Sequence, residues 1–524
     1  MSVVSGPSRE AGAIPEPLGP SALAAGGGGS SARVIGVDVA RGLALLGMIA
    51  VHIFNTLHGD NTPSKTHQVM AGHALATFVL LAGVSLTFIT KRSRTGSLLP
   101  DAASLTTRAL IITLIGLALN SALDPDIDVI LPYYGLMFLL AIPLLRRSSR
   151  VLIAISIGLV LLAPLVVLAS FNTDLPDDEP TLAALIHPVE LFSPLLVTGS
   201  YPIVAYMAFI CAGMVIGRLD LSNRLVAVRL TVAGAALAAG SWLLSTLILF
   251  QFGGLQHLRA AAPPKVSQQE AENIILWDPD SVSSWWWLIE RAPYTTTPFR
   301  MVHDLAIAIA CLGLSLLITR SRLARRALGL LAAAGAMTLT LYTAHVIVLE
   351  ATSFLEDHPI QLFFVLVYIA FSFAALWRQG RRQGPLEAAV TWASARSRCL
   401  VESHSRTNRI KQPQATPGLR RQPSLVMPGN DLNELLGPLS RRDDPGHQPD
   451  RAGTAGRGVP GIPTRAAGRP RQRAVRGAGG SSGGGAFVEH RRRCHGVVDN
   501  AWPLTSRRPP KRGHAQAVAE RHGL

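Results

Sequence analysis

The sequence contains few charged residues and few cysteines. Asp, Glu, Lys and Arg make up 16% of the 524 residues, whereas soluble domains carry about 25%. Four cysteines are too few for a secreted fold held together by disulfides, and none has the spacing of a metal site. A single soluble globular domain is therefore excluded. The sequence also lacks a phosphate-binding glycine loop, a Gly-x-Ser-x-Gly elbow and a cysteine pair for redox chemistry.

The excess of positive charge lies at the C-terminal end. Lys and Arg outnumber Asp and Glu by 49 to 33 in the whole chain, and by 22 to 9 in residues 401–524. The tail 396–524 is rich in Arg, Pro and Gly, which predicts disorder. We expect this tail near anionic lipid headgroups rather than on a specific nucleic acid. Residues 1–32 are Gly-, Ser- and Pro-rich, lack the features of a signal peptide, and are predicted to form a disordered leader.

The apolar residues between these extensions form about ten long runs. A bilayer core needs about 20 apolar residues in a helix, and backbone groups in lipid must pair internally, which favours helices over strands. Residues 33–395 are therefore predicted to form an all-α, polytopic membrane helix bundle of about ten transmembrane helices. The runs fall approximately at 34–55, 71–90, 106–122, 128–145, 151–170, 200–217, 228–250, 302–319, 327–349 and 359–377.

The loops between the runs alternate in charge. Arginine-rich loops follow the second, fourth, sixth, eighth and tenth runs, and acidic loops follow the third, fifth and ninth. Positively charged loops stay in the cytoplasm, so Arg322 is predicted inside and Asp178 outside. Both termini are then cytoplasmic, and the chain is predicted to be a multi-pass protein of the plasma membrane.

The first run carries an ion pair and a histidine. Asp38 and Arg41 are three residues apart and share one helical face. His52 follows Asp38 by fourteen residues, which returns it to within about 40° of that face and about 21 Å further out. Ionisable residues in membrane helices normally face the bundle interior or a water-filled cavity. The alternative is that the pair only anchors this helix and that His52 is a hydrogen-bonded packing residue.

Other polar residues are predicted at the same outer boundary, namely His73, His303, Asp304 and His345. A histidine can take up a proton or act as a nucleophile near neutral pH, and Asp304 can orient a histidine on another helix. Interfacial packing is the alternative for each of them. No metal-ligand pattern is present. The triplet Trp285–Trp287 is predicted to anchor at lipid headgroups, with a sugar- or lipid-binding platform as the alternative.

Four motifs within residues 33–395 together resemble a known family. In chain order they are Gly36-Val-Asp38-Val-Ala-Arg41-Gly42, the stretch from Tyr201-Pro202 to Asp220, the stretch from Gly335 to His345, and Gly384-Pro385-Leu386-Glu387. Their order is similar to that in membrane proteins related to heparan-alpha-glucosaminide N-acetyltransferase, in particular a bacterial branch of unknown function. This chain has Pro293-Tyr294 where close relatives are expected to carry a Pro-His-type motif.

The resemblance implies transfer of an acyl group from cytoplasmic acyl-CoA, the donor substrate, to a glycan-like or other small-molecule acceptor outside the membrane. It implies that Arg41 lies near the donor phosphates and that His52 or His345 is the base or a transient acyl carrier. The predicted catalytic residues are His52, His345 and Asp304, and the predicted substrate-binding residues are Asp38, Arg41, His303 and Tyr342, with no metal. A transporter or lipid translocator would use the same ion pair and cavity. A non-catalytic membrane protein is the third reading.

Overall fold

The structure, a computed structural model, consists of helices and the segments that connect them. It describes residues 34–54, 56, 62–91, 98–123, 127–261, 268–277, 284–352, 358–381 and 383–411, and no strand occurs among them. Described residues up to Ser405 belong to one compact unit, and residues 406–411 belong to another. The predicted leader, residues 1–32, lies outside the described residues.

Seven helical segments are long and apolar enough to cross a membrane. They are α1 (Ile35–Ile53), α2 and α3 together (Lys65–Met70 and His73–Lys91), α4 (Leu98–Leu123), α6 (Ser149–Ser170), α9 (Arg224–Gln251), α12 (Pro298–Ile318) and α16 (Pro359–Gly380). An eighth span forms if a pair of segments bent by 59° counts as one. This pair consists of α7 with η3 (Pro188–Ser193 and Pro194–Thr198) and α8 (Ile203–Gly217). The predicted all-α, multi-pass membrane fold is confirmed, and ten helices was an approximate count.

Two of the ten predicted runs form apolar helices that are shorter than a span. They are α5 (Leu131–Ala141, continued by η1, Ile142–Leu144) and α15 (Thr338–Ala351). The run at 327–349 breaks after α14 (Gly329–Ala334) because Gly335 packs directly against α1. A Cβ atom on Gly335 would overlap the backbone oxygen of Asp38. This close contact brings the third sequence motif onto the first.

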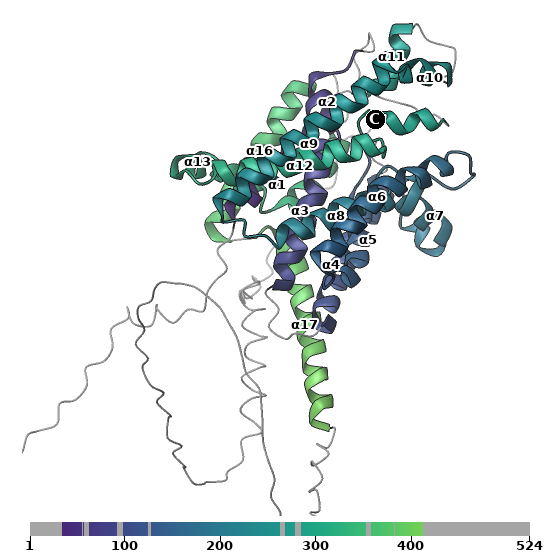
Figure 1. Cartoon of the computed structure of the whole chain (residues 1–524). Helices are drawn as coiled ribbons and strands as arrows, with labels where there is room; N and C mark the ends of the chain where they lie inside the picture. The colour runs from purple at the N-terminus through teal and green to yellow at the C-terminus, as the bar shows by residue number, and fades with distance from the viewer. Residues whose placement is uncertain are drawn as a thin grey trace, which may run out of the picture. The chain divides into compact units, whose positions relative to one another are not determined.

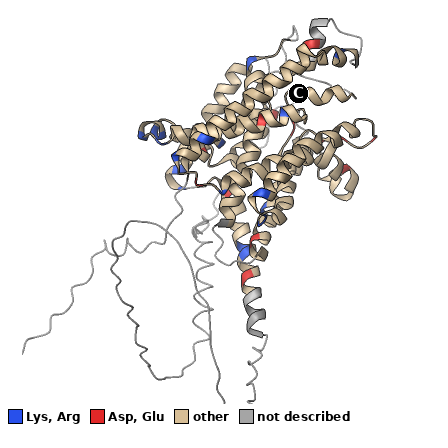
Figure 2. Ribbon diagram, viewed as in Figure 1, with Lys and Arg blue, Asp and Glu red and all other residues tan. Residues whose placement is uncertain are grey.

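Glycines allow the long helices to approach one another closely. Helix α9 lies along α12, and α3 lies along α8 (Figure 1). A Cβ atom on Gly213 of α8 would overlap the backbone oxygen of Leu80 on α3. Small residues serve this purpose in membrane bundles, where lipid removes the hydrophobic drive for helix association. Figure 2 shows that long stretches of these helices carry no charged residue and that basic residues gather at α13 (Arg322–Ala327).

Shorter helices complete the part of the chain that the structure describes. They are η2 (Ala183–Ile186), α10 (Gly254–Ala261), α11 (Gln268–Trp277), η4 (Trp285–Ile289) and the long α17 (Pro385–Lys411). The backbone N–H of Thr340 at the start of α15 donates to Glu387 at 3.1 Å, so the fourth motif caps the helix of the third. The tail boundary predicted at residue 396 falls inside α17, and the remaining tail, residues 412–524, lies outside the described residues.

Candidate functional site

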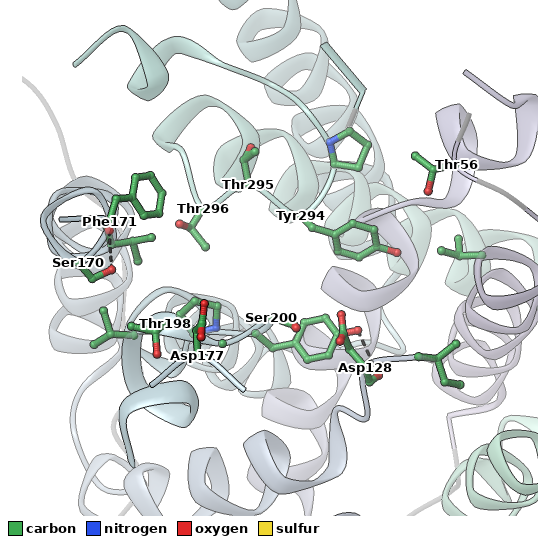
Figure 3. Close-up of a pocket in the computed structure, with 18 of the residues that line it drawn as sticks. Thr56, Asp128, Ser170, Phe171, Asp177, Thr198, Ser200, Tyr294, Thr295 and Thr296 are labelled. Carbon is green, nitrogen blue, oxygen red and sulfur yellow. Dashed lines mark hydrogen bonds between the residues drawn. The ribbon is translucent and has the colours of Figure 1, made fainter. Parts of the chain in front are cut away.

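A pocket of about 1010 Å³ opens among the ends of α1, α6 and α8 and the loops beside them. Its walls come from the end of α1 at His52, the segment before α5 at Asp128, residues 170–202 and the segment 293–296 (Figure 3). All four wall segments belong to connections or helix ends that the charge pattern predicts on the outer side. The pocket therefore lies where the sequence predicts the histidines to gather.

Two predicted catalytic residues meet beside this pocket. His52 lines the pocket, and its Nδ1 lies 3.0 Å from Nε2 of His345, although 293 residues separate them in the sequence. The two rings stack with their centroids 5.3 Å apart. His345 is 4% exposed, so it supports His52 from inside the bundle. Because the Nδ1 of His52 is engaged, its Nε2 is the nitrogen left for a ligand, and the shared hydrogen bond gives a proton a route to His345.

Tyr342, a predicted substrate-binding residue, lies behind the pocket wall. Its ring meets the His345 ring edge-on at 4.9 Å, and its hydroxyl oxygen accepts a hydrogen bond from the backbone N–H of Ile130 at 3.2 Å. Ile130 belongs to the same segment as Asp128, which lines the pocket. Tyr342 therefore connects the histidine pair to this wall, and it is not among the residues that line the cavity.

Asp304 and His303 belong to a second polar cluster. Arg300 holds Asp304 through two contacts of 2.9 Å, and Nε2 of His73 lies 3.6 Å from the same carboxylate. Nδ1 of His303 donates to the backbone oxygen of Ala238 at 3.0 Å. The structure thus places Asp304 beside a histidine of another helix, as predicted, but this histidine is His73, and the main partner is Arg300. The i,i+4 spacing of Arg300 and Asp304 was a sequence signal for that pair.

The predicted ion pair of α1 forms. Nη1 of Arg41 lies 3.1 Å from Asp38, and the guanidinium also donates to the backbone oxygen of Gly335 at 3.1 Å and to Ser85 Oγ at 3.0 Å. Three helices therefore meet at Arg41, which fits the anchoring reading. The Arg41 side chain keeps 21% of its surface exposed.

Two carboxylates on the pocket wall were interpreted from the sequence only as markers of outer loops. Asp128 and Asp177 lie on one wall, and Tyr294, Thr295 and Thr296 lie on the opposite wall (Figure 3). They are the only acidic residues that line the pocket, and no Lys or Arg lines it among the residues that the structure describes. The alternating loop charges placed these acids on the outside, but nothing in the sequence showed that separate loops share one cavity.

A third carboxylate lies close to this acidic wall. Glu179 accepts a hydrogen bond of 2.8 Å from the hydroxyl of Tyr133. Burial and the nearby charge of Asp128 raise the pKa of Glu179 to about 7. Glu179 therefore exchanges its proton near neutral pH.

Tyr294 takes the place where relatives are expected to carry a histidine. Its φ of 65° is in the left-handed region, which a bulky residue adopts at an energetic cost. The strained turn sets the tyrosine ring in the pocket wall (Figure 3). Burial raises the pKa of Tyr294 to about 12, so its phenol is neutral and can donate a hydrogen bond at physiological pH.

The tryptophan triplet is divided between two environments. Trp287 is 3% exposed, lines the pocket and packs edge-on against Phe171 with ring centroids 5.1 Å apart. Trp285 is 74% exposed. Trp287 thus adds an aromatic surface to the cavity, whereas Trp285 has the exposure expected of an interfacial anchor.

Comparison with known proteins identifies a related family. Residues 33–252 match the family model described as the catalytic domain of heparan-alpha-glucosaminide N-acetyltransferase. A search of curated proteins found no match. The matched stretch contains the first two sequence motifs, and contacts at Gly335 and Glu387 attach the other two to it. No group of three His, Cys, Asp or Glu side chains suited to a metal ion occurs in the described part of the chain.

Proposed function

We propose that this chain, whose residues 33–252 match the family model of heparan-alpha-glucosaminide N-acetyltransferase catalytic domains, transfers an acyl group from cytoplasmic acyl-CoA to a glycan-like acceptor outside the membrane. The observation that carries this proposal is the His52–His345 pair on the wall of the pocket. The pocket walls come from segments predicted on the outer side, which supports an acceptor that arrives from there.

His52 is the proposed reactive group. Its free Nε2 either removes a proton from the acceptor hydroxyl or amine, or attacks the thioester carbon and holds the acyl group until the acceptor displaces it. In the first route the deprotonated acceptor attacks the thioester carbon, the C–S bond breaks and CoA leaves as the thiolate. In the second route the same bond breaks as Nε2 attacks, and the acceptor then attacks the acyl carbon and passes its proton to the imidazole as the acyl–imidazole bond breaks. In both routes His345 can accept the Nδ1 proton of His52 as Nε2 becomes cationic.

The inner end of α1 has a separate proposed role. Arg41 is fixed by Asp38, Gly335 and Ser85, and its guanidinium is a planar, permanently charged group of the kind that suits phosphate recognition. The ion pair thus serves as an anchor for the bundle and as a contact for the donor. His303 and Asp304 lie in the second cluster and are proposed to hold the outer wall in place.

Transfer of labelled acetyl from acetyl-CoA to mixed envelope glycans tests the proposal with the purified protein in lipid. We expect His52→Gln to lower the rate by at least about 100-fold, the size of a general-base contribution. His187→Gln is the matched control, because His187 is an exposed histidine of an outer connection and should leave the rate unchanged. Equal losses in both variants would reject the assignment, and substrate flux into vesicles without label transfer would favour a transporter.

Incubation with labelled acetyl-CoA in the absence of acceptor separates the two routes. If His52 carries the acyl group, rapidly quenched wild-type protein holds label that His52→Gln lacks. If His52 is only a base, neither protein holds label, although the wild type still transfers it when acceptor is added.

We also propose that the chain lies in the plasma membrane with both termini in the cytoplasm. Asp178 and Arg322 are both exposed. Asp178 lies in an acidic loop, predicted outside, and Arg322 lies in an arginine-rich loop, predicted inside. In a background without the native cysteines, Asp178→Cys should react with an impermeant thiol reagent added to intact cells, and Arg322→Cys should react only after lysis. The reverse pattern would invert the orientation.

A further inference from the structure

The charge of the pocket is of one sign. Asp128 and Asp177 are the only Asp, Glu, Lys or Arg residues that line it among the described residues, and both are exposed. Glu179 lies close to the same wall. Carboxylates gathered at a cavity with low-dielectric walls focus a negative potential into it, which repels anions.

The remaining lining combines hydroxyl groups with aromatic rings. Hydroxyls come from both walls, as at Ser200 and Thr295, and rings come from Tyr201 and Trp287. Thr296 on the pocket wall is 4% exposed, and its Oγ1 has no hydrogen-bond partner in the protein. A buried hydroxyl without a partner is uncommon, because a buried polar group that makes no hydrogen bond destabilises the fold by about 1–3 kcal/mol. Thr296 thus leaves a hydrogen-bonding group of this wall without a partner among the described residues.

These two observations together narrow the acceptor. Hydroxyls and ring faces suit a polyhydroxylated molecule, whereas the acidic wall disfavours a sulfated or carboxylated one. We propose that the acceptor is a polyhydroxylated molecule without anionic groups, and that Asp128 and Asp177 exclude polyanionic glycans from the pocket. This inference rests on the proposed function for the identity of the pocket, but it concerns binding and not transfer.

Binding of three tetrasaccharides with the same backbone tests the inference without any donor. One is N-acetylated and neutral, one carries free amines, and one is sulfated, and each is titrated into the full-length protein in lipid at low salt. We expect the amine form to bind at least as tightly as the neutral form, and the sulfated form at least about tenfold more weakly than the neutral form. The ratio of the affinities for the neutral and sulfated forms should fall towards one when the ionic strength is raised to about 0.5 M, because salt screens the charges.

The double variant Asp128→Asn, Asp177→Asn keeps the side-chain shapes and removes the charges. We expect it to bind the sulfated form about tenfold more tightly than the wild type does, with little change for the neutral form. Asp178→Asn is the matched control, since Asp178 is an exposed neighbour in sequence that does not line the pocket, and its preference should match that of the wild type.

Three results would overturn the inference. They are binding of the sulfated form as tight as that of the neutral form in the wild type, an unchanged ratio in the double variant, and no binding of the neutral form. A protein that shows the expected preference but transfers no acetyl group would contradict the proposed function alone, so the two failures are distinguishable.

Discussion

Two histidine clusters are predicted at the same membrane boundary, and they differ in what surrounds them. His52 has His345 as its hydrogen-bond partner and opens onto the pocket. His73 and His303 lie beside the buried pair of Arg300 and Asp304. The Nδ1 atom of each histidine is hydrogen-bonded to a backbone oxygen. The same residue type is therefore available for chemistry in one cluster and committed to packing in the other.

This difference shows why a polar residue in a membrane helix does not by itself identify a catalytic group. Arg300 and Asp304 are each 5% exposed, and removing either partner of an ion pair this deeply buried leaves an uncompensated charge. Arg300 also donates to the backbone oxygens of Ala71 and Arg291. That cluster fixes the start of α3 against α12.

The largest effect on stability is expected from breaking the buried pair. Arg300→Met leaves the Asp304 carboxylate buried without its cation, which should lower the free energy of unfolding by about 3–5 kcal/mol. Thermal unfolding in detergent measures this effect. Arg322→Met, at an exposed position, is the control and should change the unfolding midpoint little, as should His52→Gln. A similar midpoint for Arg300→Met and wild type would contradict the structural role of the second cluster.

A buried acid without a partner should give the fold a pH dependence. Glu290 is 0% exposed, and neither of its carboxylate oxygens has a hydrogen-bond partner. Burial raises its pKa from the usual 4.5 to about 8. The folded state then binds the proton more tightly than the unfolded state, so stability is lost as the pH rises from about 4.5 to about 8, by a few kcal/mol at most.

Glu290→Gln replaces the titratable carboxyl group with a neutral amide and tests the sign of the pH dependence. We expect the variant to have a flatter profile of unfolding midpoint against pH between 5 and 9, and to be more stable than the wild type at the alkaline end. Glu190→Gln, at an exposed acid, should keep the wild-type profile. A midpoint of the wild type that rises with pH more steeply than that of Glu290→Gln would contradict the burial of a neutral carboxyl.

A smaller effect is expected at the turn that seats Arg300. Gly72 has a φ of 73°, and a Cβ atom there would overlap the guanidinium of Arg300. Gly72→Ala should therefore destabilise the fold by about 1–3 kcal/mol. Gly158→Ala places its Cβ in open space within α6 and should be neutral or slightly stabilising. Equal unfolding midpoints for the two variants would show that the cluster tolerates displacement.

The smallest effect is expected from Tyr342→Phe, which acts on the first cluster. It removes the hydroxyl that accepts from Ile130 and should cost about 0.5–1.5 kcal/mol. Because this hydroxyl connects the pocket wall to the ring beside His345, the rate of transfer should fall more than the unfolding midpoint suggests. A loss of rate that simply follows the loss of folded protein would make Tyr342 a packing residue only.

The sequence predicted those features that depend on local spacing. The apolar runs, the pair of Asp38 and Arg41, and the outer position of His52 follow from helix periodicity and hydropathy. The break of the ninth run at Gly335 was missed, because it arises from contact with a helix about 300 residues earlier.

Other features of the site depend on contacts between distant segments. The pairing of His52 with His345 across 293 residues, and the meeting of Asp128 with Asp177 on one wall, come from tertiary packing. The pairing of Asp304 with Arg300 could have been predicted from the sequence, because the two residues are four apart on one helix. The pocket itself was not, because its walls are loops whose paths the helix pattern leaves open.

Transfer across a sealed membrane tests most directly whether the His52 pocket accepts the acyl group from the opposite side. Vesicles carrying the protein in one orientation would hold labelled acetyl-CoA in the lumen that faces α13, with glycan acceptor only outside. We expect labelled glycan outside the wild-type vesicles and at least about 100-fold less with His52→Gln. Label that appears only on acceptor placed with the donor, or equally with both proteins, would contradict the account.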